Sequence, residues 1–471
     1  MHTIQTMHTP LTWDESLIKR FDLSGPRYTS YPTAPHFSPA FNLEDWRAAA
    51  LRSDLSQAPL SIYCHIPFCE TVCYYCGCNK IITANKKRAL PYLAALKTEI
   101  TLQAQYFNNQ RPVVQFHFGG GTPTYLSDDQ LTDLMAHFRK HFNFATEDQL
   151  EASIEIHPQT VTPERLAALK KLGLNRISLG IQDFNAEVQK AVNRFNSAEE
   201  VAHLCQAARR LDFKSISMDL IYGLPKQTPA SFSATVDSII ALKPDRLSLF
   251  SYAHMPHLFK VQQQIIASDL PSSRDKLSML HLSIDKLQAA GYRYIGMDHF
   301  ALPDDELAQA QDAGQLHRNF QGYSTRGGCD LLAFGVSAIN QVNDTYAQNF
   351  KDITAYQNAL EQGQLPLHKG LRLSRDDIIR KAVINQLICH FHLQYQAIEA
   401  RFGLVFKDYF ADALAELAPL AEANLCRLSD TGIHITDPGR LLIRRVCMAF
   451  DAYLADQNQE PEQAKRYSKI I

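Results

Sequence analysis

Short apolar runs alternate with longer amphipathic segments along the first two thirds of the chain. Six of the runs are rich in β-branched and aromatic residues and are predicted strands: 61–66, 113–118, 153–157, 176–181, 215–221 and 246–252. The intervening segments place apolar residues at helical spacing, as in 90–107, 131–142 and 163–174. Strands that alternate with helices pair in parallel through helical crossovers. Six units are too few for a closed eight-stranded barrel, so the pattern predicts an open or partial α/β barrel.

Polar residues or glycines follow directly after several of the predicted strands. The stretches that show this are FHFGGGTPT, IEIHP, GIQDF, MDLIYG and FSYAH. Functional residues in parallel α/β folds gather at the carboxyl ends of the strands. The pattern therefore predicts one functional edge of the barrel. A further strand is predicted at 292–301.

Both flanks of the predicted barrel have a different character. Near the N-terminus only 43–52 has helical periodicity, and 24–37 (SGPRYTSYPTAPHF) favours turns and extended structure. A boundary is predicted near 364–372, after which Ser374 and Asp377 form a capping-box pattern that opens a helix. The stretch LCRLSDTGIHITDPGRLLIRRVCMAF predicts a hairpin that leads into a helix.

Composition and charge exclude several classes of protein. The chain has 471 residues, 45% of them apolar and 20% charged, with a formal net charge of −2. This balance gives no global attraction to nucleic acid or to an anionic membrane. The start of the sequence lacks the pattern of a signal peptide, and no apolar run approaches the roughly 18 residues that a membrane span needs. We expect a cytoplasmic protein with no nucleic-acid or membrane partner.

Four of the ten cysteines lie within FCETVCYYCGC, residues 68–78. In a reducing cytosol, clustered thiols bind metal more often than they form disulfides. Zinc sites usually take cysteines as two pairs, but only Cys73 and Cys76 form a CxxC pair, and ferredoxins use other spacings. Spacing alone leaves an iron–sulfur cluster, a zinc ion and structural thiols as alternatives. In a [4Fe–4S] cube, the three thiolates of C-x3-C-x2-C would leave one iron open for another ligand.

Three consecutive glycines, Gly119 to Gly121, follow the second predicted strand. Backbone without side chains can approach a ligand closely, and its N–H and C=O groups are available for hydrogen bonds. By itself such a turn is weak support for a binding site, but it gains weight beside the cysteine motif.

C-x3-C-x2-C is the signature of the radical S-adenosylmethionine (SAM) superfamily. Within that superfamily the sequence resembles the oxygen-independent coproporphyrinogen III oxidases nearly from end to end. The motifs that carry the resemblance are SGPRYTSYPTA, HIPFCETVCYYCGCNK, GGGTPTYL, SIEIHP, RISLGIQDFN, SMDLIYGLP, SYAHMP, HRNFQGYST and FGVSAI. The resemblance implies an α/β fold with a partial (β/α)6 radical SAM barrel at 53–367. It also implies an N-terminal segment at 1–52 that folds against the active site and a mainly helical C-terminal domain with a small hairpin at 368–471.

The resemblance also implies a reaction. Enzymes of this family decarboxylate the propionates on rings A and B of coproporphyrinogen III to the vinyl groups of protoporphyrinogen IX, in anaerobic haem biosynthesis. A 5′-deoxyadenosyl radical abstracts hydrogen from the propionate β-carbon. The cofactors so implied are one [4Fe–4S] cluster and two SAM molecules. The expected partner is a small electron-donor protein such as flavodoxin or ferredoxin. The resemblance also favours a monomer.

The motifs assign roles to particular residues, all by resemblance. The implied cluster ligands are Cys69, Cys73 and Cys76. The residues implied for the first SAM are Tyr63, Tyr75, Gly120, Glu155 and Ile339. Those implied for the second SAM are Gly121, Thr122, Gln182, Arg194, Asp219 and Ala253. Candidates for the substrate carboxylates are Arg27, Tyr28, His317 and Arg318.

The sequence departs from the family pattern in two places. Cys64 is not part of the motif and is expected to be a buried strand residue. Phe195 and Asn196 follow Arg194 where polar residues are expected, which leaves the shape of the second SAM site open. Cys78 is not expected to be a fourth ligand, because a fourth thiolate would occupy the iron that SAM needs.

Two other functions compete with the oxidase. A haem-chaperone-like radical SAM relative shares the barrel, but typically lacks a cysteine at position 78 and the GPRYTSYP segment, both present here. A regulator is the second alternative, with a C-terminal winged helix that binds DNA through Arg440, Arg444 and Arg445. The nearby acids Asp430 and Asp437 argue against a basic face.

Overall fold

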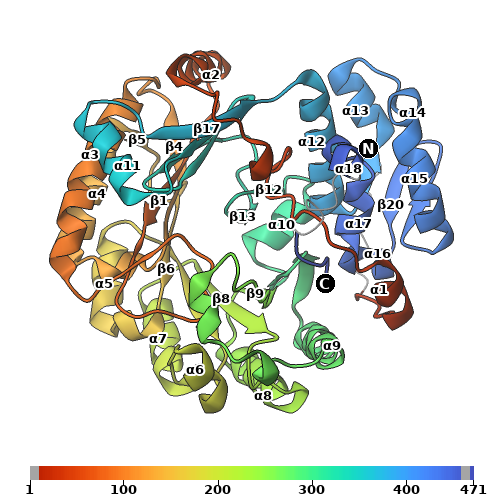
Figure 1. Cartoon of the computed structure of the whole chain (residues 1–471), viewed down its shortest axis with the longest axis horizontal. Coiled ribbons are helices and arrows are strands. Elements are labelled where there is room, and N and C mark those ends of the chain that lie inside the picture. Colours follow the sequence, from red (N-terminus) through yellow and green to blue (C-terminus); the bar gives the residue numbers. More distant parts are fainter. Residues whose placement is uncertain (1–9, 458–466) are drawn as a thin grey trace. The chain divides into compact units, whose positions relative to one another are not determined.

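The computed structural model of the chain describes residues 10–457 and 467–471. By Cα proximity the chain forms two compact units (Figure 1). The larger unit contains Phe37–Lys286 and Gly328–Arg372, and the smaller contains the chain up to His36, Leu287–Gly327 and the chain from Leu373 onward. None of the described helices is long and apolar enough to cross a membrane. The borders of the three domains proposed from sequence stay a prediction.

A parallel sheet forms the centre of the larger unit, and all six predicted strands belong to it. The strands are β1 (Leu60–Ile66), β4 (Pro112–Gly120), β6 (Glu151–Ile156), β7 (Arg176–Gln182), β8 (Ser215–Tyr222) and β9 (Arg246–Ser251). Each pairs in parallel with the next in that order, and β5 (Asn143–Phe144) extends the sheet beside β4. Because the strands are parallel, their carboxyl ends meet at one edge, as the polar residues after each strand predicted.

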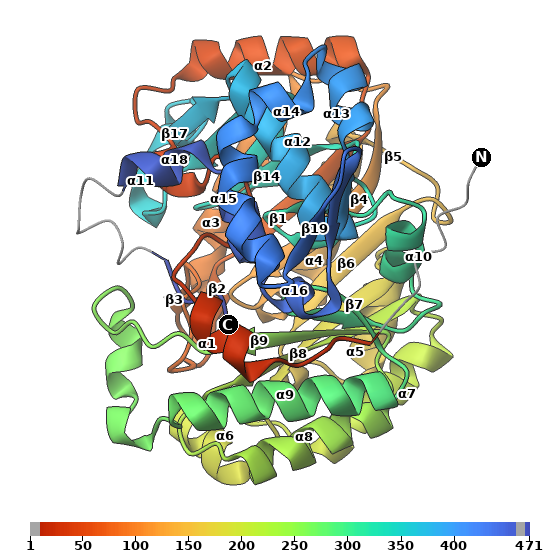
Figure 2. The same ribbon diagram turned by 90° about the vertical axis from the view of Figure 1, so that its right-hand side faces the viewer.

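Helices connect these strands and lie on the outer face of the sheet (Figure 1). They are α3 (Ala89–Ala104), α4 (Asp128–His141), α5 (Pro163–Lys171), α6 (Ala186–Val192), α7 (Ala198–Arg210) and α8 (Pro229–Leu242), and α9 (Ser273–Ala289) follows the last strand, β9. Local sequence sets their ends. Ser127 forms a capping box with Gln130 at the start of α4. Thr162 caps α5 with Pro163 at its first position, and Gly173, at φ +90°, follows its end. Figure 2 shows α6 and α8 below β8 and β9 in the turned view.

The sheet continues on the far side of β1 with strands that the sequence pattern did not indicate. β14 (Asp330–Phe334) pairs in parallel with β1. β15 (Ile339–Val342), β16 (Thr345–Asn349) and β17 (Leu367–Arg372) follow as antiparallel strands, with α11 (Ile353–Glu361) before β17. Aromatic rings of α4, β4 and β14 pack edge to face in the core, as Phe116 and Phe334 do with Phe138. Helix α2 (Leu43–Ser56) also belongs to this unit.

The smaller unit is mainly helical with short hairpins. Its helices are α1 (Glu15–Phe21), α10 (Glu306–Asp312), α12 (Arg375–His390), α13 (Tyr395–Phe402), α14 (Phe406–Tyr409), α15 (Ala411–Glu422), α16 (Asp437–Leu441), α17 (Ile443–Met448) and α18 (Ala452–Gln457). Its strands are β10 (Arg293–Gly296), β11 (His299–Ala301), β12 (His317–Asn319), β13 (Gly322–Ser324), β18 (His392–Gln394), β19 (Cys426–Leu428) and β20 (Gly432–Ile435).

Two sequence predictions for this unit are confirmed and one needs correction. Ser374 and Asp377 form the expected capping box at the start of α12. The hairpin of β19 and β20 leads into α16 and α17, as expected. The single strand predicted at 292–301 is instead the antiparallel hairpin of β10 and β11. Gly296 at φ +148° and Met297 at φ +53° turn the chain between them.

Candidate active site

The cysteine loop begins at the carboxyl end of β1. Cys69 ends the short strand β2 (Phe68–Cys69), and β3 (Ile81–Ile82) returns beside it in parallel, with Ile82 opposite Cys69. Between them the loop is attached to the end of α6. Asn193 donates through Nδ2 to Val72 O at 2.7 Å, and the Tyr74 N–H donates to Val192 O at 3.0 Å. The loop is therefore held at both ends and in the middle.

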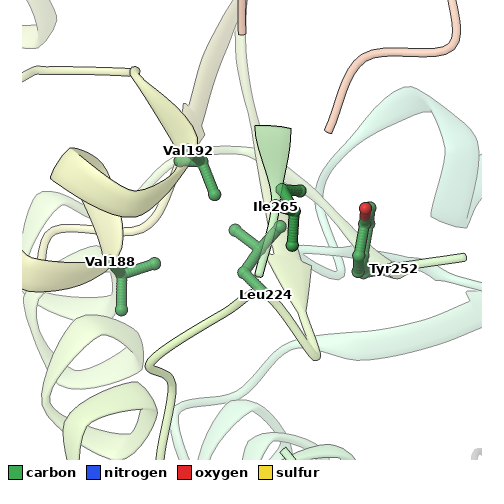
Figure 3. Close-up of a cluster of buried hydrophobic side chains, with 5 residues drawn as sticks. All are labelled: Val188, Val192, Leu224, Tyr252 and Ile265. Atoms are coloured by element: carbon green, nitrogen blue, oxygen red, sulfur yellow. The ribbon is translucent and has the colours of Figure 1, made fainter. Parts of the chain in front are cut away.

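An apolar cluster supports the middle of the loop. Its buried members are Val188, Val192, Leu224, Tyr252 and Ile265, drawn in Figure 3. Tyr74 and Tyr75 of the loop pack against this cluster. Partial burial of the two tyrosine rings stabilises the loop and helps to position the cysteines beside them.

The three motif thiols lie close enough to influence one another. Burial raises the pKa of the Cys69 thiol to about 11, and the neighbouring Cys76 and Cys73 contribute in the same direction. A hydrogen bond from the Cys78 side chain lowers the pKa of Cys76 to about 6, with help from the Lys80 ammonium. Cys78 is exposed and acts here as a partner of a ligand candidate.

The donor set suits a cube better than a single ion. Among residues 10–457 and 467–471, no group of three or more His, Cys, Asp or Glu side chains is placed to hold one metal ion. A [4Fe–4S] cube takes thiolates on separate irons, so its cysteines need not share one coordination point. Arg194 donates to the Cys73 sulfur at 3.7 Å, and Thr122 donates to the Cys69 sulfur at 3.4 Å. Such donors stabilise cluster-bound thiolates.

The triple glycine passes directly against this loop. A Cβ added at Gly121 would lie 2.9 Å from the Cys69 sulfur and 2.9 Å from the Pro67 carbonyl oxygen. Gly120 has φ +124°, and a Cβ there would lie 2.8 Å from the Ile66 carbonyl oxygen. Glycine is therefore required at both positions for the strand end to reach the cysteine loop.

Glu155 lies beside the same turn. The Gly120 N–H donates to one Glu155 oxygen at 3.0 Å, and His117 Nε2 lies 3.3 Å from the other. Partial burial raises the pKa of this carboxyl, but the hydrogen bond from His117, its charge and the Gly120 N–H outweigh it and lower the pKa overall. The Tyr63 ring stacks on the His117 ring with centroids 5.7 Å apart. The structure thus brings Tyr63, Gly120 and Glu155 together.

A histidine outside the candidate residues, His65, links Tyr63 to the cysteine loop. His65 Nε2 lies 3.0 Å from the Asn79 carbonyl oxygen, and His65 Nδ1 lies 3.1 Å from the Tyr63 hydroxyl. Because a carbonyl only accepts, Nε2 carries the proton and Nδ1 accepts from Tyr63. Burial lowers the pKa of His65, which keeps the ring neutral for both bonds. The position of His65 in the HIPFC motif was the sequence signal that could have identified it.

Arg194, Gln182 and Asp219 form a second polar group at the strand ends. Arg194 donates to the Gly180 carbonyl and is 9% exposed. A Cβ at Gly180 would lie 2.7 Å from the Arg194 guanidinium and 3.0 Å from Gln182 Nε2, so these side chains are neighbours. Arg194 Nε and Gln182 Oε1 are buried without a hydrogen-bond partner in the described chain. Burial raises the pKa of Asp219 to about 6, although Ser248 and Ser178 donate to it.

The departure after Arg194 has a structural explanation. Phe195 is 45% exposed, whereas Asn196 is buried. Asn196 donates to the Ile181 carbonyl at 3.2 Å and its N–H donates to Gln189 at 3.3 Å. Asn196 therefore fixes the backbone beside Arg194. Cys64 is fully buried in β1, as expected.

Two further buried residues position site segments. Gln262 donates to the carbonyls of Tyr75 at 3.0 Å and Ala253 at 3.3 Å, and so joins the cysteine loop to the end of β9. Glu99 of α3 accepts from the Gly335 N–H at 2.8 Å, in the turn that leads to Ile339. Neither residue has a sequence signal, because its partners are distant along the chain.

Glu99 is the centre of a buried network. It also accepts from Asn349 at 2.7 Å and from the Tyr356 hydroxyl at 2.6 Å. Burial raises the pKa of Glu99 to about 7, although these donors act in the opposite direction. The network fixes the turn before Ile339.

The candidates for substrate carboxylates belong to the smaller unit. Arg318 is 5% exposed, stacks on the Tyr323 ring at 4.8 Å, and has Nε and Nη1 without partners in the described residues. Burial lowers the pKa of His317 to about 4. Arg27 forms an ion pair with Asp298. The Tyr28 hydroxyl donates to Asp451 at 3.0 Å.

Arg444 holds the segment that carries Arg27 and Tyr28. It is 2% exposed and donates to the carbonyls of Gly25, Pro26, Lys469 and Ile470. The segment 468–471 pairs with 22–25, and the Ile470 N–H donates to the Leu23 carbonyl at 2.9 Å.

The same contacts bear on the DNA-binding alternative. Arg444 is buried, Arg440 pairs with Asp437 at 3.3 Å, and Arg445 pairs with Glu416 at 3.0 Å. These arginines are engaged inside the unit, which argues against a basic DNA-binding face.

Comparisons with known proteins show which families and solved structures the chain is similar to. The family described as "Radical SAM superfamily" matches residues 63–239, and the "HemN C-terminal domain" matches residues 373–442. The chain is 52% identical to the oxygen-independent coproporphyrinogen III oxidase of Pseudomonas aeruginosa, covering 98% of this chain and 99% of the relative. It is 48% identical to the protein of the same name from Escherichia coli K12, with the same coverage. A solved structure titled as coproporphyrinogen III oxidase (HemN) from Escherichia coli, a radical SAM enzyme, superposes with TM-score 0.90 at 49% identity. It covers 94% of this chain and all of that one.

Proposed function

Since the chain belongs to the family of oxygen-independent coproporphyrinogen III oxidases, we propose that it converts coproporphyrinogen III to protoporphyrinogen IX by oxidative decarboxylation of the ring A and B propionates. The observation that carries the proposal is the combination of an end-to-end relationship with a three-cysteine loop that is held in place at the carboxyl end of β1. Neither the relatives nor the geometry favours the haem-chaperone alternative.

The cofactors follow from the family. A radical SAM enzyme uses a [4Fe–4S] cluster and SAM, and together these supply a 5′-deoxyadenosyl radical that removes hydrogen from the substrate. We propose Cys69, Cys73 and Cys76 as the ligands. The close approach of Gly121 to the Cys69 sulfur and the donors Thr122 and Arg194 support this assignment.

We propose the turn at Gly120 as the place where the first SAM binds. Glu155 lies within reach of the same backbone, so its carboxylate can accept from ligand hydroxyl or amino groups while the Gly120 N–H orients it. Tyr63 and Tyr75 would line the site from the cysteine loop side, and Ile339 would contact the adenine.

Two molecules of SAM are a further proposal, with a second site at Gly121, Thr122, Gln182, Arg194, Asp219 and Ala253. It is supported by the buried polar atoms that lack partners, Arg194 Nε and Gln182 Oε1, because such groups are costly unless a ligand satisfies them. Arg194 is suited to a carboxylate of the ligand.

Arg318 is the residue that we propose for a substrate propionate. A buried guanidinium with two nitrogens free of protein partners needs an anion to offset its burial. Arg27, Tyr28 and His317 are proposed to complete the carboxylate contacts. We further propose a cytoplasmic monomer that receives electrons from flavodoxin or ferredoxin.

The test is anaerobic reconstitution followed by incubation with SAM, dithionite and coproporphyrinogen III. We expect 5′-deoxyadenosine and protoporphyrinogen IX, and expect Arg318→Met to raise the KM for the porphyrinogen much more than that for SAM. An intact cluster that forms neither product would refute the oxidase assignment. Haem transfer without decarboxylation would instead establish the chaperone alternative.

A further inference from the structure

A basic segment follows directly after the cysteine loop. Residues 79–88, NKIITANKKR, contain the four cations Lys80, Lys86, Lys87 and Arg88 and no acidic residue, in a chain whose formal net charge is −2. Lys86 to Arg88 form a short 3-10 helix, and all three are exposed. The segment is therefore a local positive region on a protein with no overall positive charge.

This segment is hydrogen-bonded to two of the proposed cluster ligands. The Thr83 N–H donates to the Cys69 carbonyl at 2.9 Å, and Lys80 Nζ donates to the Cys76 carbonyl at 2.9 Å. Ile82 lies opposite Cys69 in the pairing of β2 with β3 and is 39% exposed. The exposed Ile82 therefore lies on the strand that pairs directly with Cys69, whose sulfur is a proposed cluster ligand.

A second exposed segment borders the loop. Gly77 and Cys78 are exposed, and a Cβ on Gly77 would lie 3.2 Å from the Phe259 ring. Next to Phe259, Leu258 is 58% exposed and Lys260 is also exposed. We call residues 79–88 and 258–260, together with Gly77 and Cys78, the basic face. It combines cations with single exposed apolar side chains.

The acidic residue that contacts this segment, Glu70, is already ion-paired. Glu70 forms an ion pair with Lys86, whose ammonium also lies 3.7 Å from the centre of the Tyr125 ring. Lys80 is tied to the loop carbonyls. Lys87 and Arg88 therefore carry the charge that the segment can offer to an approaching protein.

We propose that the basic face docks an acidic one-electron carrier protein, which delivers electrons to the cluster through the β2–β3 pair. The inference rests on the proposed function, because only a cluster at this loop needs such a donor. One electron moves in each transfer. The carrier is oxidised by one electron, and that electron enters the sulfonium–C5′ bond of SAM, which breaks to methionine and a 5′-deoxyadenosyl radical.

The physical chemistry of such encounters fits the face. Electron-transfer complexes are small and short-lived, and complementary charge raises their association rate by about 10- to 1,000-fold at low salt. Exposed apolar groups such as Ile82 and Leu258 then supply limited contact area without a permanent interface. A carrier of net negative charge meets cations on this face although the whole chain would repel it weakly.

The experiment compares Lys87→Glu/Arg88→Glu with a matched control, Lys140→Glu/Lys171→Glu. The control reverses two exposed lysines at the ends of α4 and α5. Crossover helices run against the strands, so their ends lie at the sheet edge opposite the cysteine loop. Reduction of the reconstituted cluster is followed by bleaching of its visible absorption, with reduced flavodoxin or with dithionite as donor and without SAM or substrate.

We expect the Lys87/Arg88 variant to lose about tenfold or more in the flavodoxin-driven rate at low ionic strength and to match wild type with dithionite. The loss should shrink as salt shortens the Debye length from about 10 Å at 0.1 M to about 3 Å at 1 M. Lys87→Gln/Arg88→Gln should lose less. Titration of the cluster-free proteins with oxidised flavodoxin should show the same order of affinities.

The proposal is overturned if the flavodoxin-driven rate is unchanged, if the dithionite-driven rate falls equally, or if the control variant loses as much. Failure of the proposed function is a separate result. It would appear as absent porphyrinogen turnover in wild type, while the cluster-reduction and binding measurements still decide the docking site.

Discussion

Replacing Arg444 by Met removes the donor that holds two distant segments of the smaller unit together. Four backbone carbonyls, of Gly25, Pro26, Lys469 and Ile470, lose their shared partner. A hydrogen bond to a charged group contributes about 1.5–3 kcal/mol, and water can replace part of the loss, so we expect a cost of about 3–6 kcal/mol for release of these segments.

The consequence should be local. The released stretch carries Arg27 and Tyr28, so the KM for coproporphyrinogen III should rise about tenfold or more. The cluster absorption and the KM for SAM should remain as in wild type, because their proposed residues belong to the larger unit. Hydrogen exchange should show faster exchange of the Gly25 and Ile470 amides, which both donate to backbone carbonyls in this pairing.

Arg444→Lys provides the matched control. Its ammonium keeps the charge and up to three donors, so part of the protection and of the substrate affinity should return. If Arg444→Met exchanged and bound substrate like wild type, the carbonyls would not depend on this side chain. If it lost its cluster absorption, the effect would be global unfolding, and the idea of a local anchor would be wrong.

Three other outcomes are expected. Alanine at any of the three proposed ligand cysteines should abolish the visible absorption of the reconstituted cluster, whereas Cys78→Ala should retain most of it; loss there would mean that the ligand count is wrong. Gly121→Ala should lower cluster content at least twofold, since its Cβ would lie 2.9 Å from the Cys69 sulfur, and full iron content by colorimetric assay would contradict this. Because the pKa of Glu99 is raised from 4.5 to about 7, its contribution to stability is complete below pH 4.5 and is lost as pH rises through 7. Urea unfolding should show that Glu99→Gln reduces the pH 5 to pH 8 difference in unfolding free energy by about 2.5 kcal/mol, and an unchanged difference would refute it.

The strands that sequence predicted share a physical property. β1 is buried along nearly its whole length, whereas β6, β7 and β8 alternate buried and half-buried positions. All four therefore appear in the sequence as short runs rich in β-branched and apolar residues, bounded by glycines and polar residues. β14 is equally buried but only five residues long, and it gave no separable signal. The β10–β11 hairpin was missed because its turn is made by Gly296 and Met297, and a methionine at positive φ has no sequence signature.

The candidate site divides in a similar way. Gly121 and Glu155 could be found because they lie at strand ends and in motifs. Glu99 and Gln262 could not, because their importance comes only from partners far along the chain, namely Gly335 for Glu99 and Tyr75 for Gln262. The residues that we propose for ligand binding lie in sequence motifs, whereas the residues that hold them in place are identified only from the folded structure.

The pairing of 22–25 with 468–471 can form only late during synthesis of the chain. Arg444 lies 418 residues after Pro26, the carbonyl that it holds. During translation the partners of the segment 22–28 are therefore synthesised more than 400 residues after it. Domains generally fold as they emerge, so the barrel can fold before this pairing forms. Throughout that interval the segment is open to proteases and chaperones, and contacts of such long sequence separation form late. A nascent chain can complete its barrel while the segment that carries Arg27 and Tyr28 still lacks its partners, until residues 468–471 have been added.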